Sequence, residues 1–261
     1  MQAEDIVALL IPLTWLAMLA IEAFGTGRAW PATRFWRTRG LAFFILLGTL
    51  NALLPQWLQP LLASHHLFDG SRLGTLGGVL LGYPVLALAT ALLHRAYHRF
   101  DVLWRWVHQL HHAPQRLDTP GAVIFTPWEM ALNIVVFQVV VVLGLGLEPL
   151  AAAIVGYVAV FYGLFQHFNI ATPQWLGYLI QRPESHAVHH RRGVHAYNYS
   201  DFPLWDLLWG TFRNPKVFNG EVGFEGDSAR RLAPLLVGRD ANAPLYGPAS
   251  RGSRHPADNP A

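Results

Sequence analysis

The sequence predicts an all-α fold: a multi-pass membrane domain of about four to five hydrophobic helices, joined to a cytosolic helical cap. Two observations indicate this class. Apolar residues make up 52% of the 261-residue chain and charged residues 13%, about half the roughly 25% that is usual in soluble domains. The apolar residues also gather in runs of about twenty, the length at which a helix spans a bilayer. This composition excludes a disordered protein and a coiled coil.

Five nearly uncharged apolar runs are the predicted helices, because they are too long for strands and lack strict alternation. In chain order they are residues 6–24, 41–63, 73–93, 130–147 and 150–165. Pro55 is expected to kink or end the second helix. Glu4 and Asp5 stand where a signal peptide needs positive charge, so the first run is interpreted as a retained helix. Only Glu148 and Pro149 separate the last two runs, which predicts an antiparallel helical hairpin.

The arginines predict the orientation. The loop after the first helix carries Arg28, Arg34, Arg37 and Arg39 without an acid, so this loop is expected in the cytoplasm. Three crossings then place His94 and all later residues on the cytoplasmic side; for a bacterial protein the membrane would be the inner or plasma membrane. The net charge of +3 fits this bias better than a basic patch, so nucleic acid is not an expected partner. The shorter apolar segment 175–180 is expected in the membrane interface.

Ten of the thirteen histidines lie between positions 94 and 195, and their spacing is helical. One i, i+4 pair is followed by two HxxHH boxes, in which positions i, i+3 and i+4 share one helix face. Because all of these boxes fall at cytoplasmic helix ends, they are expected to converge on one site. Nine imidazoles are too many for one metal ion and suit two, of the kinds that imidazole favours: Zn, Cu, Fe or Ni. The predicted ligands are His94, His98, His108, His111, His112, His167, His186, His189 and His190.

The remaining histidines and the cysteine count narrow the possible sites. His65 and His66 fall in the loop on the opposite side, and His255 falls in a Pro/Gly/Ser/Asn-rich tail that is expected to be disordered. All three are interpreted as bystanders. The absence of cysteine excludes disulfides, thiolate metal sites and thiol catalysis.

The boxes HRAYH, HQLHH and HAVHH, with a hydrophobic hairpin between the second and third, resemble the fatty acid hydroxylase/sterol desaturase superfamily of membrane di-iron oxygenases. The resemblance runs from about residue 73 to 215 and includes the ending NY, WD and GTF at positions 198–212. It implies two iron ions (zinc is possible in isolated protein), O2, a lipid substrate, and hydroxylation or desaturation of that lipid. The chain is accordingly divided into N-terminal membrane helices (1–72), a catalytic domain (73–216) and a C-terminal extension (217–261).

Two departures from the family pattern leave the substrate open. Ser200 replaces the usual glycine after Asn-Tyr, and TPWE at 126–129 stands where many members have His-Pro-x-Glu. Neither is expected to touch the ligand boxes. Sterols, fatty acyl chains and carotenoids all remain candidate substrates.

Residues around the ligands are expected to orient the imidazole rings, as outer partners of metal ligands do. Asp206 is the preferred carboxylate because it falls in the family ending, and Asn198 and His195 are further candidates. His195 fits a ligand role and an outer role equally well. Other acids near the boxes in sequence are Asp101, Glu184 and Asp201.

Electrons are expected from a separate cytoplasmic protein. The chain has no cysteine for an iron–sulfur cluster and no GxGxxG segment for a flavin or nicotinamide. A ferredoxin or a cytochrome b5-like carrier is the predicted donor. The surface of this chain on which the donor docks is expected to include Arg182, Arg191, Arg192 and Arg213.

Three other functions compete with this hypothesis. A zinc hydrolase would use HExxH, but position 95 is Arg and no HExxH occurs. Axial histidines of a membrane haem subunit usually lie within the helices, whereas these lie at helix ends. A transporter would need ionisable groups inside the bilayer, which the predicted helix interiors lack. A different histidine-rich metal enzyme or a haem-binding electron-transfer subunit is the alternative to the oxygenase.

Overall fold

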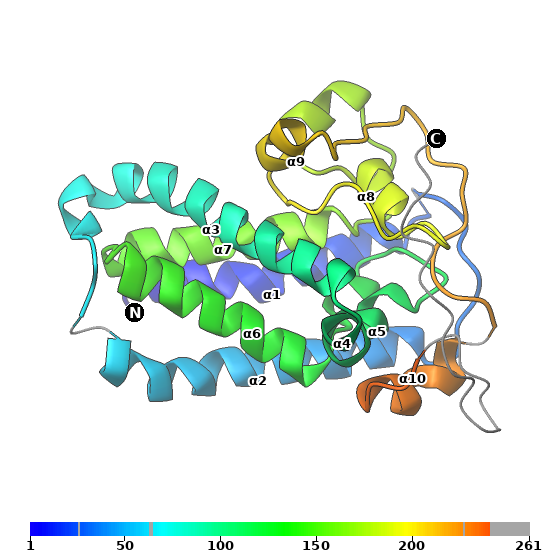
Figure 1. Cartoon of the computed structure of the whole chain (residues 1–261), viewed down its shortest axis with the longest axis horizontal. Coiled ribbons are helices and arrows are strands. Elements are labelled where there is room, and N and C mark those ends of the chain that lie inside the picture. The colour runs from blue at the N-terminus through cyan, green and yellow to red at the C-terminus, as the bar shows by residue number, and fades with distance from the viewer. Residues whose placement is uncertain (26, 63–64, 227, 241–261) are drawn as a thin grey trace.

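The computed structural model describes residues 1–25, 27–62, 65–226 and 228–240. Within these ranges every regular element is a helix, and one isolated β-bridge joins Arg191 to Val222. Long helices lie side by side along the longest axis, and shorter helices gather at one end (Figure 1). The predicted all-α class is therefore confirmed. The predicted disordered tail and His255 lie outside the described residues.

Four helices are long and apolar enough to cross a membrane. They are α1 (Ala3–Glu22), α2 (Trp36–Leu62), α3 (Gly74–Arg99, which continues the 3-10 turn η1, Gly70–Leu73), and α6 (Pro127–Phe137) with its π-helical continuation η4 (Gln138–Gly144). A fifth apolar helix, α7 (Pro149–Phe165), has 17 residues and is about 25 Å long, short of the roughly 30 Å of a hydrocarbon core.

The predicted helix 41–63 corresponds to α2, which begins five residues earlier, at Trp36. Pro55 does not end it, because α2 continues through Pro55 and Pro60 to Leu62. Proline is tolerated in apolar helices of this kind because neighbouring groups satisfy the freed backbone. The connection between the last two apolar helices is residues 145–148, longer than expected, and Pro149 is the first residue of α7, where its missing N–H costs nothing.

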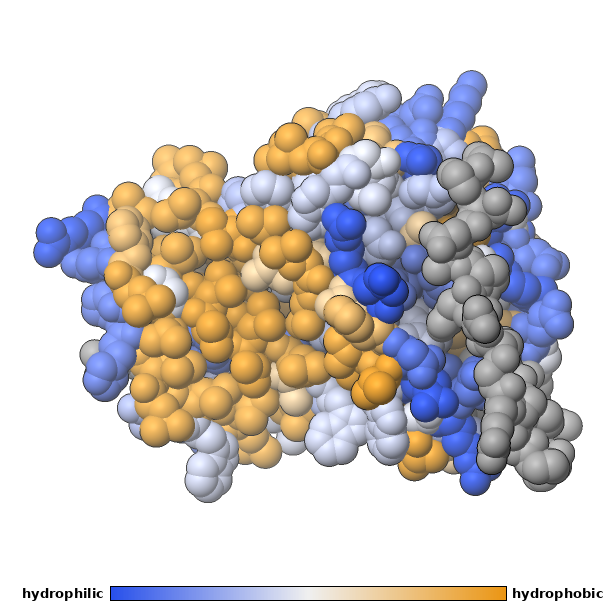
Figure 2. All heavy atoms as spheres, viewed as in Figure 1, coloured by the Kyte–Doolittle hydropathy of each residue, from blue (hydrophilic) through white to orange (hydrophobic). Residues whose placement is uncertain are grey.

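The outer surface of the bundle is apolar. Several leucines and isoleucines on α1, α2 and α3 are more than half exposed, Leu13, Ile45 and Leu80 among them. Figure 2 shows hydrophobic residues as a band over the visible face of the bundle, with hydrophilic residues at both ends. Such a band is what lipid covers, since a soluble monomer rarely exposes so large an apolar patch.

Helix α3 packs closely against α7 through small residues. A Cβ on Gly78 would meet the Cβ of Ala151 at 2.8 Å, and one on Gly82 would meet Leu147 at 2.6 Å and Val155 at 3.0 Å. The two glycines are four residues apart and so lie on one face, the arrangement that lets helices approach closely in membranes. This packing fixes the direction of α3, whose last turns carry the first histidine box.

We expect Gly82→Val to lower the free energy of unfolding by about 1–3 kcal/mol, because overpacking forces α3 and α7 apart. Gly48→Val in α2 is the matched control, since no atom lies within 4 Å of its would-be Cβ and its change in helix propensity is the same. The measurement is the melting temperature of each variant, obtained by heating the protein and recording the loss of its folded peak on size exclusion. Equal melting temperatures would contradict the packing role.

The shorter elements form a cap at one end of the bundle (Figure 1), comprising the described parts of residues 100–126 and 166–240. One irregular helix is built from α4 (Asp101–Leu103), the π-helical η2 (Trp104–His108) and α5 (Gln109–His112). The 3-10 turns η3 (Gly121–Val123) and η5 (Gln174–Tyr178) follow, then α8 (Pro183–His189), α9 (Pro203–Trp209) and α10 (Ser228–Leu236).

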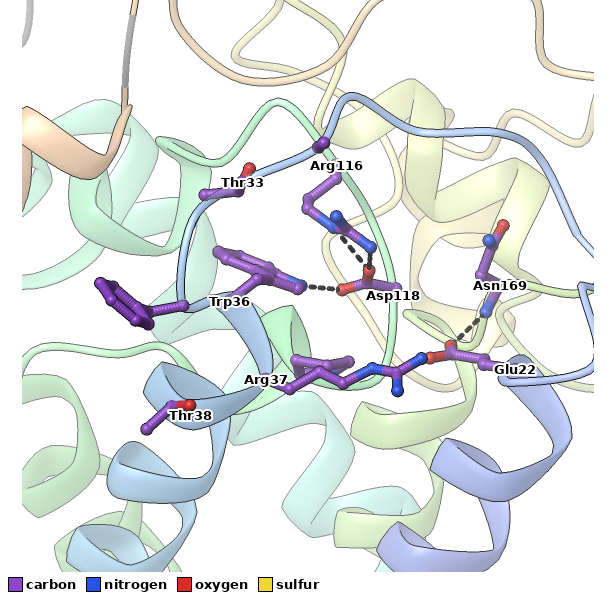
Figure 3. Close-up of a pocket in the computed structure, with 11 residues that line it drawn as sticks. Glu22, Thr33, Trp36, Arg37, Thr38, Arg116, Asp118 and Asn169 are labelled. Atoms are coloured by element: carbon purple, nitrogen blue, oxygen red, sulfur yellow. Dashed lines mark hydrogen bonds and ion pairs between the residues drawn. The ribbon is translucent and has the colours of Figure 1, made fainter.

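Polar contacts tie the cap to the ends of the first two helices (Figure 3). Trp36 Nε1, in the first turn of α2, donates to the Asp118 carboxylate at 2.8 Å. At the end of α1 the Glu22 carboxylate accepts from the backbone N–H groups of Thr119 and Asn169 at 2.9 and 2.8 Å. These contacts border a polar cavity of about 450 Å³ that none of the nine predicted ligands lines. The cavity is therefore separate from the histidine cluster.

Candidate metal centre

The structure brings all nine predicted ligands together where the spanning helices meet the cap. Helix α3 extends past residue 93 to Arg99, so the first box occupies its last turns. The second box lies on η2 and α5, and the third lies on α8 and the residue that follows it. His167 follows the end of α7. Four separate segments thus contribute imidazoles to one place.

The nine histidines divide into two adjacent groups, and within each group the ligand nitrogens all lie within 4.8 Å of one another. The first group contains His94, His98, His108, His112 and His189. The second group contains His111, His167, His186 and His190. The groups touch where the rings of His112 and His190 stack at 4.1 Å.

Each HxxHH box serves both groups. In the second box the two outer histidines, which are four residues apart, join the first group, while His111 joins the second. In the third box the outer pair joins the second group, while His189 crosses into the first. The two boxes therefore exchange their middle histidines, so each group depends on both boxes.

The nitrogen–nitrogen distances fit imidazoles around one ion. The Nε2 atom of His108 lies 2.9 Å from that of His94 and 3.1 Å from that of His112. In the second group the Nε2 atoms of His167 and His186 are 3.0 Å apart. Ligands held at about 2.0–2.1 Å from one metal ion stand roughly 2.9–3.4 Å from each other. These spacings match that geometry.

The tautomers of two histidines fit a cation between these nitrogens. His94 Nδ1 donates to the Tyr199 carbonyl at 2.7 Å, and His189 Nδ1 donates to the Tyr197 carbonyl at 2.8 Å. A carbonyl can only accept, so the Nε2 atoms of both histidines carry lone pairs. His189 Nε2 is buried without a hydrogen-bond partner, an arrangement that costs free energy unless a cation binds there. The residues present therefore fit a metal ion.

Burial keeps the imidazoles neutral. The histidines of the second group are 5% exposed or less. Loss of solvation lowers the pKa of His167 to about 3 and, together with the neighbouring imidazoles, lowers the pKa values of His186 and His190 well below the usual range. Neutral imidazole is the form that binds metal, so no proton has to be displaced at neutral pH.

Glu129 contacts a predicted ligand directly, so the expectation that the TPWE segment stays clear of the boxes is wrong. His108 Nδ1 donates to Glu129 Oε1 at 2.7 Å, and both side chains are buried. Thr126 caps the N-terminus of α6, accepting from the Glu129 N–H at 3.2 Å and donating to the Val107 carbonyl at 2.9 Å. This cap holds Glu129 beside η2, where it fixes the His108 tautomer with Nε2 as the acceptor.

Two backbone carbonyls orient histidines of the first group, and the chain is turned sharply to present them. Tyr197 and Asn198 have φ angles of 70° and 50°, in the left-handed region that a bulky residue rarely adopts. The turn is held by Asn198, whose Nδ2 donates to the carbonyls of Ser185 and Arg213. Asn198 therefore supports the site through the backbone and not through a ring contact.

Asp206 acts in the same indirect way. Its carboxylate accepts from the N–H groups of Tyr199 and Ser200 at 3.0 and 2.7 Å and from the Thr211 hydroxyl at 2.6 Å. These bonds fix the peptide whose carbonyl accepts from His94. The expectation that Asp206 orients a ring is thus corrected: it orients the carbonyl that orients the ring.

We expect Asp206→Ala to lower the free energy of unfolding by on the order of 3 kcal/mol, since it leaves the buried N–H of Ser200 and the partly buried N–H of Tyr199 without acceptors. Asp101→Ala is the control, because Asp101 forms only an exposed pair with Arg105 at 3.2 Å and should change little. Thermal melting of both variants checks the difference. A wild-type melting temperature for Asp206→Ala would refute the supporting role.

The other acids named from the sequence bind elsewhere. Glu184 accepts from the backbone N–H and the hydroxyl of Thr172, and Asp201 accepts from Gln166 Nε2 at 2.9 Å. Burial raises the pKa of Asp201 to about 6. None of these contacts reaches a histidine ring.

His195 lies beside the first group and outside both sets of ligand atoms. Its ring packs edge-on against Trp104 at 4.4 Å and stands 5.8 Å from the ring of His98. His65 and His66 are exposed in the connection before η1 and belong to neither group. The site thus gathers the nine expected histidines and adds Glu129 and the carbonyls of Tyr197 and Tyr199.

A comparison with protein-family models identifies this arrangement. The model of the fatty acid hydroxylase family matches residues 79–211, about half of the chain, from α3 to the end of the NY…WD…GTF segment. The chain belongs to the fatty acid hydroxylase family. Searches of curated proteins and of solved structures gave no match. The family assignment and the four apolar helices make the chain a membrane protein with an oxidoreductase domain.

Proposed function

We propose that this fatty acid hydroxylase family member is a membrane-bound di-iron oxygenase that hydroxylates or desaturates a lipid C–H bond. It would use O2 and electrons from an external donor. The observation that carries the proposal is the pair of buried, all-imidazole groups that meet at the His112–His190 stack. Two ions held side by side by neutral nitrogen ligands suit iron, and they also suit zinc in isolated protein.

The chain's own residues position and shield the two ions. Two iron ions, when bound, would supply O2 activation and hydrogen abstraction from an unactivated carbon. Glu129 and the carbonyls of Tyr197 and Tyr199 hold their histidines in single tautomers, so each presents a lone pair toward the site. Most of the site's histidines are 5% exposed or less, so the cap excludes bulk water.

Substrate access from the membrane is supported by the position of the site. His94 and His98 lie on the last turns of α3, which is continuous with the candidate span. A lipid that enters beside α3 would therefore reach the metal centre without leaving the apolar layer. Sterols and acyl chains could both enter by this route, so product analysis has to identify the class of lipid.

The donor surface differs from the one expected. Arg182 is fully buried and donates to the carbonyls of Pro215 and Lys216, so it is removed from the expected docking set. Its role is to anchor the segment after the GTF ending to the start of α8. Arg191 and Arg213 are exposed and remain in the proposed docking surface for an acidic carrier such as a ferredoxin or a cytochrome b5-like protein. Arg192 also remains; it is partly exposed and pairs with Glu221 at 2.7 Å.

The proposal is tested with purified protein loaded with ferrous iron. Two irons per chain and O2-dependent product from a lipid extract are expected only when a ferredoxin or cytochrome b5 with its reductase is added. Sustained product with NAD(P)H alone would disprove the external donor. One bound metal ion, or a haem absorption band, would disprove the di-iron centre. Zinc in protein as isolated would not count against iron, since imidazole binds both.

We also propose that the N-terminus is exported and that the cap lies in the cytoplasm. The four-arginine loop between α1 and α2 supports this orientation. A green fluorescent protein fused to the C-terminus is expected to fluoresce, while an alkaline phosphatase fused there should be inactive. The same reporters on the N-terminus should give the opposite result. Active phosphatase at the C-terminus would reverse the topology.

A further inference from the structure

Exposed apolar side chains also occur on the cap, outside the spanning helices. They come from η5 with the residue that follows it and from α9, two elements that contact each other, and they are between 40% and 67% exposed. Figure 2 shows hydrophobic residues over α9, separated from the band over the bundle by a narrow strip of paler residues. We call this surface the apolar foot; its residues are Trp175, Tyr178, Leu179, Leu204, Leu207 and Leu208.

The local sequence of α9 holds the leucines outward. Leu204, Leu207 and Leu208 are spaced i, i+3 and i+4 and so lie on one face, while Asp206 on another face is buried in its backbone contacts. Pro203 begins the helix, and Gly210 ends it in the left-handed conformation with φ 72°. The leucine face therefore cannot turn inward without breaking the bonds of Asp206 to Tyr199 and Ser200.

Contacts with α3 place α9 beside the membrane-spanning part of the bundle and not above it. Trp205 Nε1 donates to the Pro84 carbonyl at 3.2 Å, and the ring of Phe202 packs against Tyr83 at 6.0 Å. Pro84 precedes His94 by ten residues, which is about 15 Å along the helix toward the middle of the candidate span. Helix α9 thus packs beside α3 through Phe202 and Trp205.

An arginine marks the polar edge of this surface. The guanidinium of Arg95, on α3, lies over the Trp209 ring at 4.7 Å. Long basic side chains at the margin of an apolar face suit a lipid surface, because the stems pack against acyl chains while the charges reach the phosphates.

We infer that the apolar foot inserts into the membrane interface on the cap side, so that lipid anchors the cap through η5 and α9 as well as through the spanning helices. The occupant is the bilayer, since the foot lies beside α3, a candidate membrane span, and Arg95 stands at its edge. This inference rests on the membrane placement of α3 and does not depend on the metal or on the reaction.

The absence of cysteine allows a direct test, because each introduced cysteine is the single labelling site. Leu207→Cys and Leu208→Cys are labelled with an environment-sensitive fluorophore in phosphatidylcholine nanodiscs, with and without lipids that carry a quenching spin label high on the acyl chain. Leu80→Cys, exposed on α3, is the control within the membrane. Glu221→Cys, whose side chain is 73% exposed and paired with Arg192, is the control in water.

We expect the labels on the foot to be quenched at least about threefold more than the label at Glu221, since interfacial helices bury their apolar face by about 5–10 Å. Quenching near that of Leu80 would support the same conclusion. Quenching at both leucines equal to that at Glu221 would overturn the inference and leave the foot as a surface for another protein. Leu204→Cys serves as a third position if one variant does not elute as a folded monomer.

Discussion

His189→Ala is expected to lower bound metal from two ions per chain to one or fewer and to reduce turnover at least about 100-fold, because even outer partners of metal ligands cost 10–100-fold when lost. His189 reaches from the third box into the first group, so its loss leaves that group without its only ligand from α8. Elemental analysis of purified protein and product formation measure the two effects.

The control for this variant is His65→Ala, which changes an exposed histidine before η1 and should alter neither metal content nor turnover. Melting temperatures of both proteins after chelation separate a loss of ligand from a loss of fold. Two bound ions and full activity in His189→Ala would remove the third box from the first group and would refute the exchange of ligands between the boxes.

Glu129→Gln is expected to weaken metal retention and activity about 10–100-fold while it keeps the size and shape of the side chain. The Glu129 carboxylate accepts from His108 Nδ1 at 2.7 Å, and its negative charge makes the lone pair of His108 Nε2 bind a cation more strongly. The neutral amide of Gln lacks that negative charge. Competition with a chelator measures retention, and turnover is measured on fully loaded protein.

Glu148→Gln is the matched control, because Glu148 is a partly buried carboxylate that accepts from the Thr75 hydroxyl at the other end of α3. Glu148→Gln should lower the melting temperature, because the bond from Thr75 to a charged carboxylate is lost, and it should leave metal retention unchanged. Wild-type retention in Glu129→Gln would show that the His108 tautomer is set by another group and that Glu129 only fills space.

The sequence predicted the convergence of the histidines because their spacing is a property of single helices. Positions i, i+3 and i+4 share a face whatever the helix packs against, and the helix ends followed from the apolar runs. How the histidines divide into two groups depends on how α5 and α8 face each other, and no spacing within one box encodes that. His189 and His111 therefore could not be assigned to their groups in advance.

The groups that orient the ligands were harder to predict for a different reason. Glu129 lies 21 positions from His108 and reaches it only because Thr126 caps α6 against η2. The carbonyls of Tyr197 and Tyr199 are backbone groups, which every residue has, so a search for carboxylate side chains near the boxes could not find them. The sequence feature closest to an indication is Glu129 itself, the last residue of TPWE, which matches the Glu of the family's His-Pro-x-Glu. The sequence does not show that this residue contacts a ligand.

The π-helical segment η2 has a consequence for how this chain tolerates changes in length. A π turn holds an extra residue compared with an α turn, so Trp104–His108 contains one residue more than regular backbone bonding would need. Deleting a residue here would let the backbone relax into a regular α-helix and would change which residues of the second box share a face with His108. The shortened chain would keep its local backbone bonds, so the length of the segment before His108 bears on the geometry of the ligands more than on folding.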